Sequence, residues 1–141
     1  MPPEAVTKDW PYQARTGDLV VRVKPSYLPD QSDPAERRWV WAYQIEIENQ
    51  GRRTVQLLSR HWIITDAVGR VEQVKGPGVV GEQPVLGPGE AFTYTSGCPL
   101  STPSGVMAGR YQMKLVGGGE LFEIEIPAFS LDLPQARRVV N

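Results

Sequence analysis

Apolar and polar residues alternate along most of this chain, in short runs that glycine and proline separate. The clearest run is 39–49, WVWAYQIEIEN, where large apolar side chains share one phase and glutamine or glutamate takes much of the other. A period of two is typical of a strand that buries one face, whereas a helix would scatter these residues. Similar runs complete a predicted set of about seven strands: 18–24, 39–49, 55–64, 71–74, 91–96, 107–115 and 121–129.

One apolar face per strand predicts an all-β fold, an immunoglobulin-like sandwich of about seven strands in two antiparallel sheets. Tyr111 then takes the place of a tyrosine corner, near the start of the penultimate strand. Arg22 falls on the solvent-facing phase of its strand. We expect 97–103 to be a loop and Pro127 to mark the end of a strand or an edge position.

The run 55–64 changes phase once. Val55 and Leu57 share one phase, but Trp62 and Ile64 fall in the opposite one. A slip of this kind is what a β-bulge produces, since one extra residue moves every later side chain to the other face. We therefore predict a bulge near residues 58–60, which re-aims the two residues that follow, Arg60 and His61.

A glycine-rich run, Gly76-Pro77-Gly78-Val79-Val80-Gly81, fits the pattern G-x-G-x-x-G of dinucleotide-binding proteins. That motif needs a helix after its last glycine, but 82–89 holds prolines and glycines where the helix would be. The run is therefore predicted to join two strands. Its glycines either supply positive φ angles at a turn or present backbone amides to an anion as a nest.

The residues on and beside this run form the candidate ligand-binding site. Charge from Lys75 and Arg60 would assist an anion bound by the amides. The full candidate set is Arg60, His61, Lys75, Gly76, Gly78, Gly81 and Glu82. His61 and Cys98 are each the only residue of their type, so together they cannot supply the four ligands of a structural zinc site. The acidic residues on the turns lack the spacing of a metal loop. We predict no catalytic residue, no metal site and no cofactor.

Length and charge narrow the picture further. The chain has 141 residues, which suits one domain, and a formal net charge of -1, which argues against a nucleic-acid-binding surface. We find neither an apolar run of membrane length nor a secretory signal at the N-terminus, and the single cysteine fits a reducing compartment. We expect a cytoplasmic protein with an N-terminal arm at 1–13 and a single domain at 14–141.

A series of motifs in this order resembles the ApaG family. The motifs are VQLLSRHWIITD (55–66), GPGVVGEQP (76–84), LGPGE (86–90), YTSG (94–97), M-x-G-x-Y-x-M (107–113) and IP-x-F-x-L (126–131). The resemblance implies a fibronectin type III-like or immunoglobulin-like sandwich. It also implies an indirect link to cobalt and magnesium tolerance and, from similar eukaryotic domains, protein binding. It supplies no catalytic residue.

Taken together, these observations predict a non-enzymatic binding module that recognises a protein partner. The alternative is a phosphate- or nucleotide-binding protein that uses the loop Gly76–Gly81 with Arg60 and Lys75.

Overall fold

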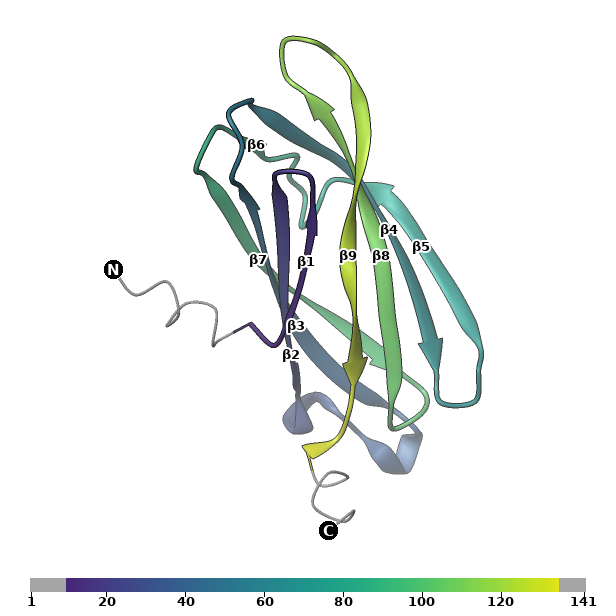
Figure 1. The fold of residues 1–141 in the computed structure, drawn as a ribbon. Coiled ribbons are helices and arrows are strands. Elements are labelled where there is room, and N and C mark those ends of the chain that lie inside the picture. The colour runs from purple at the N-terminus through teal and green to yellow at the C-terminus, as the bar shows by residue number, and fades with distance from the viewer. Residues whose placement is uncertain (1–9, 135–141) are drawn as a thin grey trace, which may run out of the picture.

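The computed structural model describes residues 10–134, which fold into two antiparallel sheets (Figure 1). The four-stranded sheet has the order β1-β2-β3-β7, and the other has the order β5-β4-β8-β9 with the short β6 beside the start of β4. The strands are β1 (Tyr12–Thr16), β2 (Leu19–Tyr27), β3 (Trp39–Asn49), β4 (Val55–Asp66), β5 (Val71–Pro77), β6 (Val85–Leu86), β7 (Ala91–Leu100), β8 (Gly105–Leu115) and β9 (Leu121–Leu131). Two 3₁₀ turns, Pro29–Gln31 and Pro34–Glu36, lie between β2 and β3. The predicted all-β sandwich is confirmed.

The core lies between the sheets and is built from the apolar phase of each strand. At its centre, the ring of Trp62 contacts Tyr43 and Phe129, with ring centroids 5.3 and 5.9 Å apart. Trp41 is 1% exposed, and its indole N–H donates to the carbonyl of Asp132 over 2.9 Å. Packed aromatic pairs of this kind stabilise a core beyond the area that they bury. Within residues 10–134, no helix is long and apolar enough to cross a membrane.

The predicted bulge in the fourth strand is present. The pairing of β4 with β8 shifts its register between Leu57 and Ser59. A second shift, between Met107 and Gly109, lies in the pairing of β8 with β9. Pro127 lies opposite this irregularity, on a strand at the edge of its sheet, where the missing N–H breaks no regular ladder.

Several sequence-based boundaries differ from the structure. Tyr12 and Gln13, assigned to the N-terminal arm, pair with β2 in β1, while residues 1–9 of that arm lie outside the described residues. The expected loop at 97–103 begins four residues later, because β7 continues to Leu100. Gly97 and Pro99 are poor strand formers, but β7 is an edge strand, and pairing with β3 outweighs their propensity.

Tyr111 does not form a tyrosine corner. It is fully buried in β8, and its hydroxyl oxygen lies 2.6 Å from the hydroxyl oxygen of Tyr94 on the facing sheet. A tyrosine corner instead bonds to backbone a few residues upstream. The inward phase of Tyr111 was correctly predicted, and only its partner differs.

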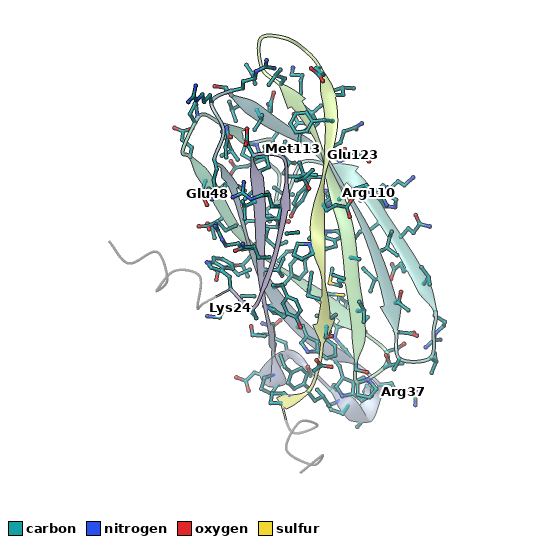
Figure 2. All side chains as sticks on the ribbon, viewed as in Figure 1. Lys24, Arg37, Glu48, Arg110, Met113 and Glu123 are labelled. Atoms are coloured by element: carbon teal, nitrogen blue, oxygen red, sulfur yellow. The ribbon has the colours of Figure 1, made fainter. Side chains whose placement is uncertain are left out.

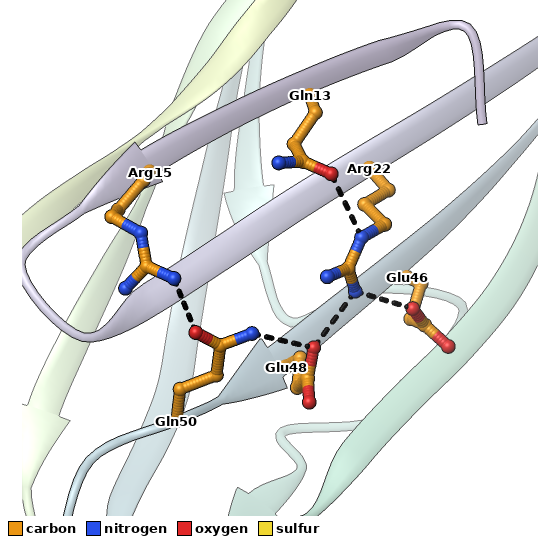
Figure 3. Close-up of polar contacts among 6 residues, drawn as sticks. All are labelled: Gln13, Arg15, Arg22, Glu46, Glu48 and Gln50. Carbon is orange, nitrogen blue, oxygen red and sulfur yellow. Dashed lines mark hydrogen bonds and ion pairs between the residues drawn. The ribbon is translucent and has the colours of Figure 1, made fainter. Parts of the chain in front are cut away.

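Arg22 also departs from expectation. It lies on the outer face of β2, as predicted, but is only 7% exposed because neighbouring polar side chains cover it (Figure 3). Its Nη1 donates to the carboxylates of Glu46 (2.8 Å) and Glu48 (2.9 Å), and its Nε donates to Gln13 (3.0 Å). The cluster links β1, β2 and β3 across the outside of the sheet, so it stabilises the pairing of these strands.

The two sides of the sandwich differ. On one side β1 and β9 lie against each other (Figure 1), where the backbone N–H of Glu125 donates to the Thr16 hydroxyl over 3.0 Å. The rings of Tyr12 and Phe129 also meet there, with centroids 6.0 Å apart. On the other side the outermost strands are β5 and β7, and no ladder joins them in the described part of the chain. The sandwich is therefore closed along β1 and β9 and open between β5 and β7.

Candidate functional site

A cavity of about 390 Å³ lies at the open side of the sandwich. One wall comes from β3 and β7, and the other comes from β4 and the turn that follows β5. Its lining residues are Tyr43, Arg60, Trp62, Pro77, Val79, Val80, Gly81, Tyr94 and Ser96. The glycine-rich run singled out in the sequence thus borders a hollow, but with neighbours from strands far away in the chain.

Arg60 supplies the cationic group of the cavity. The bulge after Leu57 gives Arg60 the same phase as the buried Trp62, so its side chain belongs to the inner face of β4. The guanidinium lies over Gly76, where an added Cβ would come within 3.0 Å of Nη1. Nη1 donates to the carbonyls of Pro77 and Gly78, both over 3.0 Å. Gly76 therefore serves to make room for the cation.

Tyr43 and Tyr94 line the cavity together with this cation, and Tyr111 lies opposite Arg60 in the pairing of β4 with β8. Burial raises the pKa of Tyr94 and of Tyr111 well above 10.0, and the pKa of Tyr43 is raised by the same cause. The charge of Arg60 acts in the opposite direction on all three, but more weakly than burial. All three phenols are therefore neutral at physiological pH. The cavity combines one positive charge with neutral hydroxyl groups, an arrangement suited to a ligand with one negative charge.

The turn beyond β5 is a tight hairpin with an unusual backbone. Val79 and Glu82 exchange two backbone hydrogen bonds (2.8 and 2.9 Å), and the residues between them have positive φ angles, 43° at Val80 and 81° at Gly81. Positive φ at both central residues defines a type I′ turn, which favours asparagine, aspartate or glycine over valine. Gly78 also has positive φ, and an added Cβ there would lie 2.4 Å from the carbonyl oxygen of Glu82.

This geometry bears on the two interpretations of the glycine run. The amide of Gly78 donates to the carbonyl of Leu58 over 2.8 Å, and those of Val79 and Glu82 bond each other's carbonyls. Meanwhile the carbonyls of Pro77 and Gly78 accept from Arg60. The turn thus directs carbonyls towards a cation, whereas an anion nest needs converging free amides. The geometry favours glycines that supply positive φ over a nest that holds phosphate.

The structure places the predicted site residues around two hollows, and Arg60 borders both of them. Arg60, Gly76, Gly78 and Gly81 lie at or beside the cavity. His61 and Lys75 face each other on the ladder of β4 and β5, in the phase of the outer face. There they line a different hollow, of about 230 Å³, which Ser59, Arg60, Gly76, Arg110, Gln112 and Glu123 also border. Figure 2 labels two of these residues, Arg110 and Glu123. His61 Nε2 lies 2.7 Å from Gln73 Oε1.

Glu82 is exposed and takes part in the turn through its backbone.

The sequence did not identify Tyr43, Tyr94 and Ser96 as site residues, because their inward phase identified them only as core. Their hydroxyl groups at inward positions were a usable signal, since a buried hydroxyl needs a polar partner. Tyr94 has that partner in Tyr111, while Ser96 acts to lower the pKa of Tyr43, against the larger effect of burial.

Cys98 is a buried residue of β7 and not the loop thiol that the sequence suggested. Burial, followed by the nearby charge of Glu72, raises the pKa of its thiol to about 11. A thiol held neutral in this way is a poor nucleophile. Across residues 10–134 there is no group of three or more His, Cys, Asp or Glu side chains that could hold a metal ion.

Comparison with known proteins adds the family context. The family model described as the ApaG domain matches residues 29–115. The chain is 62% identical to the "Protein ApaG" of Mesorhizobium japonicum over 130 residues, which cover 92% of this chain and 99% of that protein. The corresponding protein of Brucella anthropi has the same identity and coverage. The crystal structure of a Bordetella pertussis protein described as ApaA superposes with a TM-score of 0.80 at 52% identity, covering 84% of this chain and 95% of that one.

Proposed function

The chain belongs to the ApaG family, and we propose that it is a non-catalytic binding module that recruits a protein partner by adding a strand to the free edge of β7. Strand addition to an open sheet edge is a common way to bind an extended peptide, because the backbone supplies the hydrogen bonds.

One observation carries the proposal: β7 is a free edge of ten residues, AFTYTSGCPL, without a charged side chain. Natural sheets protect their edges with lysine, proline, bulges or a covering element. The other long outer strands follow this rule. β5 carries Glu72, Lys75 and Pro77, whereas β1 and β9 cover each other. β7 has only Pro99, near its end.

The backbone of β7 is oriented for such an addition. The N–H of Asn49 donates to the carbonyl of Glu90, next to the pair Glu48 and Ala91. Residues of an antiparallel ladder alternate between bonding towards one neighbour and towards the other. This alternation turns the N–H and C=O groups of Thr93, Thr95 and Gly97 away from β3, towards the free side.

The phosphate or nucleotide alternative has less support from this geometry. Three amides of the turn already bond to backbone carbonyls, and Lys75, the second cation it requires, lies in the phase of the opposite face of the sheet. It keeps two observations in its favour: Arg60 borders the glycine turn, and Arg60, Lys75 and Gly76 border one hollow. Calorimetric titration with pyrophosphate tests it, and we expect no saturable binding below about millimolar concentration.

The experiment selects peptides of the length of β7 from a displayed random library and measures the tightest binder by calorimetry. Thr95→Pro removes an N–H that points towards the free side of β7. We expect this change to weaken binding about tenfold or more, because the peptide loses one hydrogen bond and meets a steric mismatch. Thr95→Val is the matched control, because it keeps that N–H and a β-branched side chain.

A hydrogen-exchange measurement in the same complex should show new protection at Thr93, Thr95 and Gly97. A library that yields no binder, or a binder that Thr95→Pro does not affect, would refute strand addition at β7. We place the interaction in the cytoplasm, where Cys98 stays reduced, and assign any effect on cobalt or magnesium tolerance to the partner.

A further inference from the structure

We infer that the partner's strand carries an acidic side chain, aspartate or glutamate, that enters the cavity beside β7 and pairs with Arg60. This inference rests on the proposed addition of a strand to β7, and it specifies the chemistry that the strand must bring. It adds a recognition site to the open edge, which alone would accept many sequences.

The charge of Arg60 has no ion-pair partner within residues 10–134. The ion pairs formed within residues 10–134 join Arg22 to Glu46 and Glu48, and Arg70 to Asp66. Arg60 takes part in none of them, although it is partly buried among aromatic side chains. Its hydrogen bonds reach two backbone carbonyls through Nη1 alone. The rest of the guanidinium fork is the part of the group that suits a carboxylate.

The cavity lies beside the inner face of β7. Tyr94 and Ser96 line the cavity from the inner face of β7. Side chains of a strand alternate between the two faces of its sheet, and directly opposite side chains lie about 5 Å apart. A strand added to β7 therefore places every second side chain on the inner face, next to Tyr94 and Ser96. One of these side chains faces the cavity that holds Arg60.

Arg60 is the one charged residue among those that line the cavity. Farther along the open side, Glu72 borders a second hollow, of about 280 Å³, together with Leu100 and Pro99 at the end of β7. A single carboxylate matches one guanidinium, whereas a phosphate dianion would leave an excess negative charge in the cavity. The open side thus selects one acidic residue at the Arg60 end of the strand.

A second copy of this chain does not satisfy these conditions. If two β7 strands paired edge to edge, each would present the sequence AFTYTSGCPL to the other. That sequence has no carboxylate, so both Arg60 side chains would keep their uncompensated charge. The structure therefore favours a different protein as the occupant.

The test compares the affinities of two peptides. One is the tightest binder from the library, and the other is the same peptide with the acidic residue predicted to face Arg60 replaced by the corresponding amide. On the unaltered protein, we expect the amide peptide to bind about tenfold more weakly or worse. On Arg60→Gln, the two peptides should differ by less than about twofold, because a double-mutant cycle isolates the pair. Arg110→Gln, on the outer face, is the matched control and should leave the tenfold difference intact.

The outcomes separate the two proposals. If Thr95→Pro abolishes binding but the amide peptide binds as well as the acidic one, strand addition stands and the acidic pairing is wrong. If a phosphoserine peptide binds more tightly than the acidic one, the site is a phosphate site and the inference is wrong. A β7-dependent dimer in sedimentation, lost in Thr95→Pro, would identify a second copy as the occupant and overturn it as well. Because the amide change is made in the peptide, a loss of stability in Arg60→Gln does not obscure the result.

Discussion

Val80 offers a direct test of the strained turn at the mouth of the cavity. Its φ angle is 43°, in the left-handed region, and its side chain is 54% exposed. A non-glycine residue in that region costs about 1–2 kcal/mol, and a branched Cβ is worse than average. Asparagine tolerates the same backbone and is similar in size to valine. We therefore expect Val80→Asn to raise the free energy of unfolding by about 1 kcal/mol, after the loss of some apolar contact.

The neighbouring glycines provide matched controls. At Gly81, where φ is 81°, an added Cβ meets nothing within 4 Å, so Gly81→Ala measures the backbone cost alone. We expect a loss of about 1 kcal/mol there. At Gly78, where φ is 62°, the Cβ would also lie 2.4 Å from the carbonyl oxygen of Glu82, so Gly78→Ala should cost more.

Urea denaturation followed by tryptophan fluorescence gives all three values. A gain of 1 kcal/mol should also raise the melting temperature by about 2–4 °C for a chain near this size. The reasoning fails if Val80→Asn lowers the stability or if Gly81→Ala leaves it unchanged, because the turn would then not have the type I′ backbone.

Three further predictions concern the scaffold. Trp41→Ala should lower the free energy of unfolding by roughly 3–5 kcal/mol, because it empties a buried site and removes the hydrogen bond to Asp132. A loss under about 0.5 kcal/mol in a urea melt would contradict the burial of Trp41. Cys98 should react slowly with a thiol reagent in the native protein and rapidly in urea, because burial and, to a smaller extent, the charge of Glu72 raise the pKa of its thiol to about 11. Equal rates in both states would show that the thiol is accessible in the native protein. Partial burial acts to raise the pKa of Glu48, but hydrogen bonds from Arg22 and Gln50 hold this pKa below 4.5. The stability that Glu48 contributes is therefore complete above pH 4.5 and is lost as the pH falls through the lower pKa of the folded state. Glu48→Gln should therefore lose less stability than the unaltered protein between neutral pH and about pH 3, and an identical pH dependence would rule out this contribution.

The sequence predicts the scaffold well where one face of a strand is strongly apolar. The phase of 39–49 predicted both bounds of β3, and the change of phase after Leu57 predicted the bulge in β4. Periodicity works for these strands because burial on one face sets their register. It failed for β1, whose short and largely polar sequence has no comparable apolar face, and for the end of β7. At both edges, pairing with a neighbouring strand decided the conformation.

The candidate site was predictable only in part. Arg60 and the glycine run were identified because they are close in the sequence, and they are also close in the structure. Lys75 was grouped with them for the same reason, although it pairs with His61 in the phase of the other face. Tyr43 and Tyr94 come from strands of the facing sheet. No local pattern relates them to Arg60, so the cavity became visible only once the two sheets were packed together.

Three features meet on the open side of the sandwich, and each is unfavourable for the free protein. An uncharged edge such as β7 risks pairing with other chains, a partly buried cation such as Arg60 lacks an ion pair, and Val80 has a strained backbone. Elsewhere the same chain avoids these costs: β1 and β9 cover each other, and Arg22 is paired with two carboxylates. An added strand with one acidic side chain would relieve the first two, and Val80 borders the same cavity. We therefore interpret this side as the proposed binding surface, and expect the stabilising Val80→Asn to weaken peptide binding.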